Sequence, residues 1–151
     1  MSDLDKILLT STFTIFGGVI VFVIGQLLSK FLIEPIHELK KAIGEVRFNL
    51  AYYAPIIHTP ISRNKERSDA VYGAVMRNSC ELLTKADAIP FYGCLPRRWA
   101  PPMKDIDKAA VDLRALTTYL HETGEKAVSH INEINARVES IERHLKLRPL
   151  E

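Results

Sequence analysis

The chain has 151 residues, of which 47% are hydrophobic and 25% are charged, and its formal net charge is +2. This near-neutral balance excludes a strong overall field for nucleic acid, so any site for an anion would be local. Cys80 and Cys94 fit no metal-binding spacing and cannot supply a disulfide framework, which predicts free thiols in a reducing compartment.

The first predicted element is a transmembrane helix over residues 7–28, a run of 22 residues without a formal charge. At about 1.5 Å per residue such a helix spans the roughly 30 Å hydrocarbon core of a bilayer. The leader has no basic cluster and no cleavage site follows, which favours an uncleaved anchor over a signal peptide. Lys6 is the single basic residue before the run and four follow within residues 30–47, which predicts an outside N-terminus and a cytoplasmic domain.

A stripe of small and hydroxyl residues runs along this predicted helix. Serine or glycine recurs there every seven residues, and hydroxyl residues occupy neighbouring helical offsets. Such a stripe lets a second helix approach closely, although these residue types are also common in membrane helices generally. The predicted transmembrane packing residues are Ser11, Thr14, Gly18, Gly25 and Ser29.

Residues 34–151 are predicted to form one cytoplasmic helical domain behind the anchor, residues 1–33. Apolar residues at alternating steps of three and four predict a juxtamembrane helix from Pro35 to Tyr53 and a second helix from Lys65 to Ile89. The prolines within residues 55–62 predict a connector between these two helices.

Residues 90–103 form the least regular stretch, with four prolines, three aromatic residues and two adjacent arginines. Arginines beside aromatic rings suit a site for nucleotide or RNA, where they pair with phosphate while the rings stack on bases. The same residues suit contact with lipid headgroups, and a loop whose rings only cap the bundle is a third interpretation. The predicted ligand-binding or lipid-binding residues are Arg97, Arg98, Trp99 and Lys104.

The longest pattern covers residues 104–146, where apolar residues form a heptad seam of nearly six repeats. Gly124 weakens its middle, so one long coiled-coil-like helix and a helical hairpin both fit. The fold class expected is all-α, with one transmembrane helix followed by a cytoplasmic bundle. Because the seam and the membrane stripe are two separate helix-association signals, we also expect a homo-oligomer.

Ordinary catalytic and metal-binding signatures are missing from the sequence. The five histidines belong to no metal-ligand pattern, and there is no phosphate-binding loop, so neither metal nor cofactor is expected. Two arginine–histidine pairs, each separated by six residues, are Arg114–His121 and Arg137–His144. They resemble the R-x(4–6)-H motif of HEPN ribonucleases, in which arginine stabilises phosphate and histidine moves a proton. Solvated residues on a helix face produce the same spacing.

The stretch FLIEPIHELKKAIGEV, residues 31–46, followed by residues 49–54 and 88–92, resembles a widespread group of small single-pass bacterial membrane proteins. This resemblance implies an inner-membrane location and no particular activity. One membrane helix plus a helical domain also looks like the HEPN-like, pore-forming accessory protein of type VI-B CRISPR systems, an oligomer that damages the inner membrane.

The leading functional hypothesis from these features is an oligomeric, membrane-perturbing effector in phage defence. The second is a membrane-tethered binding or adaptor module that uses the loop at residues 90–103. The third is a HEPN-type ribonuclease that uses Arg114 and His121.

Overall fold

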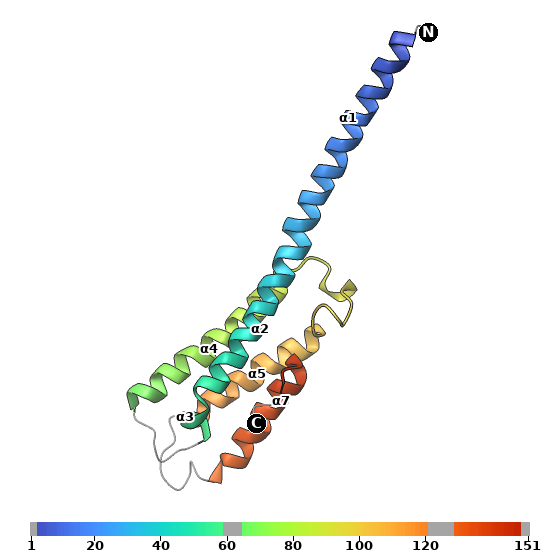
Figure 1. Ribbon diagram of the computed structural model, residues 1–151. Helices are drawn as coiled ribbons and strands as arrows, with labels where there is room; N and C mark the ends of the chain where they lie inside the picture. Colours follow the sequence, from blue (N-terminus) through green and yellow to red (C-terminus); the bar gives the residue numbers. More distant parts are fainter. Residues whose placement is uncertain (1–2, 59–64, 121–128, 149–151) are drawn as a thin grey trace.

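The computed structural model describes residues 3–58, 65–120 and 129–148, and all regular structure in these ranges is helical (Figure 1). The predicted all-α class is therefore confirmed. The elements are α1 (Asp3–Leu28), a π-helical turn (Ser29–Ile33), α2 (Glu34–Tyr52), α3 (Ala54–His58), α4 (Lys65–Asp87), a 3-10 turn (Tyr92–Cys94), α5 (Met103–Tyr119) and α7 (Ile131–Leu145).

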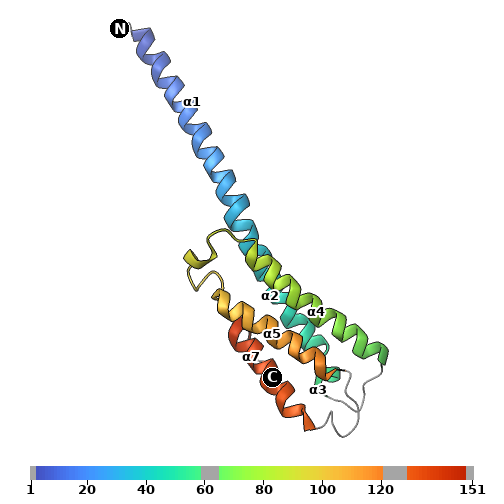
Figure 2. The same cartoon turned by 180° about the vertical axis from the view of Figure 1, so that it is seen from behind.

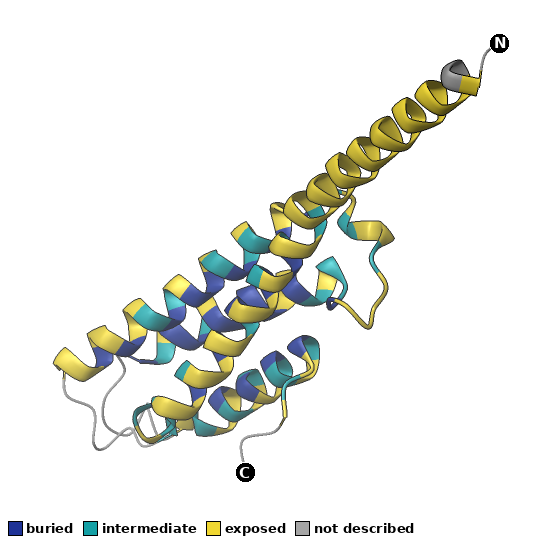
Figure 3. Ribbon diagram, turned by 45° about the horizontal axis from the view of Figure 1, so that its top comes forward, coloured by how far each residue is buried: buried dark blue, intermediate teal, exposed yellow. Residues whose placement is uncertain are grey.

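α1 extends away from the rest of the molecule as a rod and continues through the π-helical turn into α2 without a linker (Figures 1 and 2). Among the described residues, one helix is long and apolar enough to cross a membrane, and none of its apolar window is buried in the protein (Figure 3). The hydroxyls of Thr10, Thr12 and Thr14 donate to carbonyls four residues earlier at 2.8, 2.8 and 2.9 Å. These hydroxyls are satisfied inside the helix, as an apolar environment requires.

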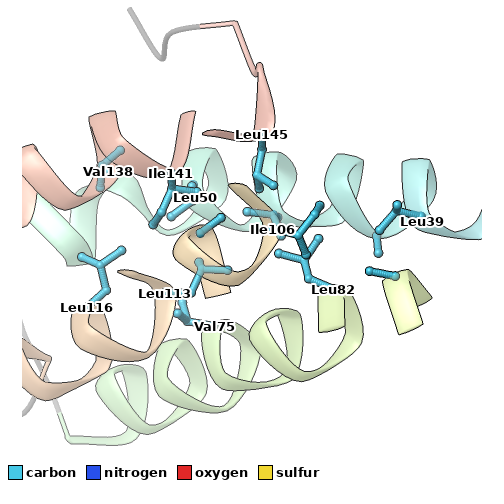
Figure 4. Packing of buried hydrophobic residues seen from close by; sticks show 14 of the residues in the cluster. Leu39, Leu50, Val75, Leu82, Ile106, Leu113, Leu116, Val138, Ile141 and Leu145 are labelled. Atoms are coloured by element: carbon cyan, nitrogen blue, oxygen red, sulfur yellow. The ribbon is translucent and has the colours of Figure 1, made fainter. Parts of the chain in front are cut away.

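The remaining long helices form an up-and-down bundle in which α4 packs between α2 and α5, and α7 packs on α5 (Figure 1). Each helix buries one apolar stripe, which is how amphipathic helices gain most of their stability. The buried apolar side chains of α2, α4, α5 and α7 meet in one core between these helices (Figure 4). Its labelled residues in that view are Leu39, Leu50, Val75, Leu82, Ile106, Leu113, Leu116, Val138, Ile141 and Leu145.

The C-terminal heptad seam forms a hairpin, because α5 and α7 pack against each other. The alternative prediction of one long helix is wrong, and Gly124, which we expected to weaken the seam, lies outside the described residues. The seam faces the core of its own chain, with nine of its residues buried: Ile106, Ala110, Leu113, Thr117, Leu120, Ile134, Val138, Ile141 and Leu145. A buried seam is not available to a second copy, so it no longer argues for self-association.

The predicted connector at residues 55–62 is in part helical. α3 (Ala54–His58) places Pro55 in its first turn, where the missing N–H needs no partner. Ile57 is buried by this short helix at the end of the bundle remote from α1 (Figure 1). The structural reason for the difference is that proline ends a preceding helix but also starts a new one.

Candidate functional site

The loop between α4 and α5, residues 88–102, lies at the end of the bundle from which α1 emerges (Figures 1 and 2). Trp99 in this loop is 46% exposed, and it faces the start of α2 across a groove of ≈ 240 Å³. The other residues that line this groove are Ile33, Ile36, His37 and Lys40. The structure thus places the predicted aromatic and basic cluster beside the base of the apolar helix.

Hydrogen bonds hold this loop in a defined shape. The Tyr92 hydroxyl donates to the Pro101 carbonyl at 2.7 Å, and burial raises the pKa of Tyr92 to about 12, so the phenol remains a donor at neutral pH. The Trp99 amide donates to the Pro96 carbonyl at 2.8 Å. Lys146, just after α7, donates to the Arg97 carbonyl at 3.0 Å. The exposed side chain of Arg97 therefore extends from an ordered backbone.

Phe91 is the most exposed large apolar residue of the loop, at 83%. Its backbone has φ 55° and ψ 37°, the left-handed conformation, which is unfavourable for a bulky side chain. Phe91 thus combines an exposed apolar ring with a strained backbone, and strain of this kind concentrates at ligand-binding positions. Phe91 belongs with Trp99 as an exposed aromatic residue on the α1 end of the bundle.

The other predicted residues fall into separate places. Lys104 is exposed on the first turn of α5. The stripe residues are exposed, and apart from adjacent residues and the backbone of the same helix no described atom lies within 4 Å of a Cβ added at Gly18 or Gly25. Arg114 is exposed on α5, whereas its predicted partner, His121, lies outside the described residues. The structure therefore does not bring the first arginine–histidine pair together as a site.

A row of polar side-chain contacts between α5 and α7, which we call the polar ladder, was not predicted from the sequence. Its three rungs join residues whose spacing along each helix is seven: Asp105 with His144, Asp112 with Arg137, and Tyr119 with His130. His144 Nδ1 lies 3.1 Å from Asp105 Oδ1, and Arg137 Nη1 donates to Asp112 Oδ1 at 2.6 Å. Arg137 and His144, the second arginine–histidine pair, thus contact different carboxylates of α5.

A cleft of ≈ 330 Å³ opens along the second and third rungs, lined by Lys108, Asp112, Tyr119, Glu133, Arg137 and Ser140 among others. Asp112 is only 4% exposed, and Ser140 Oγ donates to its Oδ2 at 2.7 Å. The hydrogen bond to Asp112 is the main reason that the pKa of Arg137 is raised. The cleft therefore contains a buried carboxylate that fixes a partly exposed guanidinium.

The far end of this cleft is aromatic and acidic. The Tyr119 hydroxyl donates to Glu133 Oε2 at 2.8 Å, and His130 Nδ1 lies 3.2 Å from the same oxygen. The bond from Tyr119, followed by that from His130, lowers the pKa of Glu133, while the same bond raises the pKa of Tyr119. Both shifts favour a phenol that donates to an ionised carboxylate.

Within the described residues, no group of three or more His, Cys, Asp or Glu side chains is arranged to hold a metal ion. No protein family model matches the chain, and no curated protein and no solved structure matches it either. The resemblances to small bacterial membrane proteins and to HEPN proteins stay predictions that rest on the residues quoted for them. The geometry of the loop and of the cleft is what bears on function.

Proposed function

We propose that this protein is a single-pass protein of the bacterial inner membrane that holds a helical binding module against the cytoplasmic leaflet. The observation that carries the proposal is the contact of Trp99 with the groove at the start of α2, directly below an exposed apolar helix. The basic residues that follow this helix support a cytoplasmic bundle, because basic residues are enriched on the cytoplasmic side of membrane helices.

The level of Trp99, measured along the common axis of α1 and α2, agrees with a position at the membrane interface. The charge-free run ends at Leu28, and Ile33, which lines the groove with Trp99, is five residues further on. Five residues of helix advance by about 8 Å. The headgroup layer extends about 5 to 8 Å beyond the hydrocarbon on each side of a bilayer, which is where tryptophan concentrates.

The chemistry of the loop suits the same location. Arg97 and Arg98 are exposed next to Trp99, so their guanidinium groups are available to lipid phosphate. Phe91 exposes an apolar ring on a strained backbone, and contact with lipid would remove that ring from water. A nucleotide site in this loop would use the same arginines, but it does not account for the position of the loop at the base of α1.

The sole tryptophan of the chain makes this contact measurable. In full-length protein reconstituted into nanodiscs, we expect lipids brominated near the headgroup to quench Trp99 fluorescence more than lipids brominated near the bilayer centre. Arg97→Glu/Arg98→Glu is expected to reduce quenching in bilayers that contain anionic lipid, because each basic residue near such a surface contributes about 1 kcal/mol.

The matched control is Lys65→Glu/Arg67→Glu, which changes net charge equally at the start of α4, remote from α1 (Figure 1). Its quenching should equal that of the unaltered protein. If brominated lipid leaves Trp99 unquenched at every depth, the loop does not contact lipid and the proposed seating of the module is wrong.

Self-assembly through α1 is a second candidate, supported by the small-residue stripe, which the bundle leaves uncovered. Gly18→Leu/Gly25→Leu is expected to reduce the mass of the full-length particle in detergent, because leucine prevents close helix approach. Val19→Leu/Val23→Leu, at exposed positions outside the stripe, serves as the control. If the double glycine variant still forms the oligomer, the stripe does not mediate assembly. The remaining argument for a pore-forming effector would then be lost.

A further inference from the structure

We propose that two copies of this protein pair side by side through the outward face of α2, with Phe48 at the centre of the contact. This inference rests on the membrane orientation proposed above, because anchoring fixes how two copies can meet. The surface concerned is separate from the loop at residues 88–102 and from the cleft between α5 and α7.

The outward face of α2 is the side opposite its buried stripe. Lys41, Gly44, Phe48 and Ala51 follow one another at alternating steps of three and four, and all are exposed. Phe48 is 64% exposed and Tyr52 is 66% exposed, and their rings stack with centroids 5.7 Å apart. Two adjacent aromatic rings are thus open to solvent on a helix whose other side is packed in the core.

Lipid does not account for these exposed rings. Phe48 is 20 residues beyond Leu28, where the charge-free run ends. That length of helix is about 30 Å, whereas the headgroup layer extends only about 5 to 8 Å beyond the hydrocarbon. In the proposed orientation the outward face of α2 therefore lies below the headgroups, where only a protein surface can cover it.

Membrane anchoring sets the geometry in which a second copy can approach this face. Both copies of α1 would cross the bilayer in the same direction and to the same depth, so the two α2 helices would run parallel and in register. The exposed positions have the spacing of a parallel coiled coil, with Lys41 and Phe48 at a positions and Gly44 and Ala51 at d positions.

The sizes of these side chains suit such a pairing. In a parallel dimer, a side chain at an a position enters a hole that includes the neighbouring d positions of the facing helix. The hole for Phe48 would be bounded by the partner's Gly44 and the partner's Ala51, whose small side chains leave room for a ring. Lys41 would face its own copy, and one polar residue at an a position fixes the register at a cost in stability.

Charges beside this seam are complementary between copies. In a parallel coiled coil each g position faces the e position of the next heptad in the partner. Lys40 takes a g position and Glu45 the e position that it faces, so the two-fold symmetry would form this ion pair twice. Both side chains are exposed, and among the described residues neither forms an ion pair. Arg47, at the next g position, would face the partner's Tyr52, which places a cation beside a ring.

Sedimentation equilibrium of the full-length protein in density-matched detergent measures the dissociation constant of the dimer. Phe48→Ala is expected to raise this constant about thirtyfold or more, because a large aromatic residue is lost from the centre of the interface. Lys40→Glu and Glu45→Lys should each raise it about tenfold, because each places like charges opposite one another. Lys40→Glu/Glu45→Lys restores opposite charges and should restore the original constant.

Two variants on α5 are the matched controls. Val111→Ala truncates an apolar residue that is 51% exposed, and Arg114→Glu reverses an exposed charge. Both should leave the dissociation constant unchanged. Residues three and four apart are neighbours on a helix, and Lys40 and Glu45 are not so spaced, so recovery in the double variant reports pairing between copies.

The proposal is overturned if the protein is monomeric at every concentration, or if Phe48→Ala and Val111→Ala dissociate alike. A double charge variant that stays as weak as the single variants would also overturn it. If only Gly18→Leu/Gly25→Leu dissociates the dimer, assembly uses α1 and not α2. Trp99 quenching separates these results from the proposed membrane seating, because a monomer whose Trp99 is quenched near the headgroups would lose the pairing and keep the seating.

Discussion

Replacing Arg137 with methionine is expected to lower the free energy of unfolding by about 3 kcal/mol, because it leaves a buried carboxylate without its cation. Among the described residues, Asp112 would keep the side-chain hydrogen bond from Ser140. We place the loss at the lower end of the usual range because the Arg137 side chain is 39% exposed and water enters the gap. Urea denaturation followed by helical circular dichroism measures the change.

Two variants control this prediction. Arg114→Met removes an exposed arginine from α5 and should change stability by less than about 0.5 kcal/mol. Asp112→Leu/Arg137→Met should recover most of the loss, since an apolar pair of similar volume replaces a buried ion pair without an orphaned charge. Equal stability of Arg137→Met and the unaltered protein would show that Asp112 is solvated and that the ladder does not stabilise the hairpin.

Leu113→Ala is expected to lower the free energy of unfolding by about 2 to 5 kcal/mol, because it opens a cavity in a close-packed core. Leu113 is 0% exposed and belongs to the predicted heptad seam. Val111→Ala, on the same helix at 51% exposure, is the matched control and should cost little.

The same variant distinguishes an inward seam from an intermolecular coiled coil. With the seam inside the bundle, Leu113→Ala lowers stability without changing the mass of the native particle in light scattering. A lower particle mass, together with a urea denaturation midpoint that depends on protein concentration, would show that the seam joins copies of the chain.

Much of the fold was predictable because it depends on local patterns. The charge-free run marks α1, and apolar spacing marks α4, whose observed end at Asp87 lies close to the expected end at Ile89. The hairpin was one of two alternatives, the other being a single long helix. A heptad seam does not determine whether it packs against its own chain or against another copy. α3 was missed because Pro55 signals the end of one helix as readily as the start of another.

The candidate sites were predictable to different extents. The composition of residues 90–103 indicated a loop with arginines beside aromatic rings, but its place beside Ile33 depends on how α4 packs on α2. The cleft was missed because Asp112 and Arg137 are 25 residues apart and belong to different helices. The seven-residue recurrence of polar residues beside the apolar seam is the signal that would have found it.

In the proposed membrane orientation, the continuous helix from α1 through the π-helical turn into α2 leaves no linker between the membrane and the bundle. A bilayer thinner than the apolar run tilts a membrane helix, because tilting keeps its excess apolar length in the hydrocarbon. Here the same tilt would swing α2 with it and carry the whole bundle sideways over the leaflet. If the bundle lies in the cytoplasm as proposed, bilayer thickness would thus set the angle at which the cleft between α5 and α7 faces it.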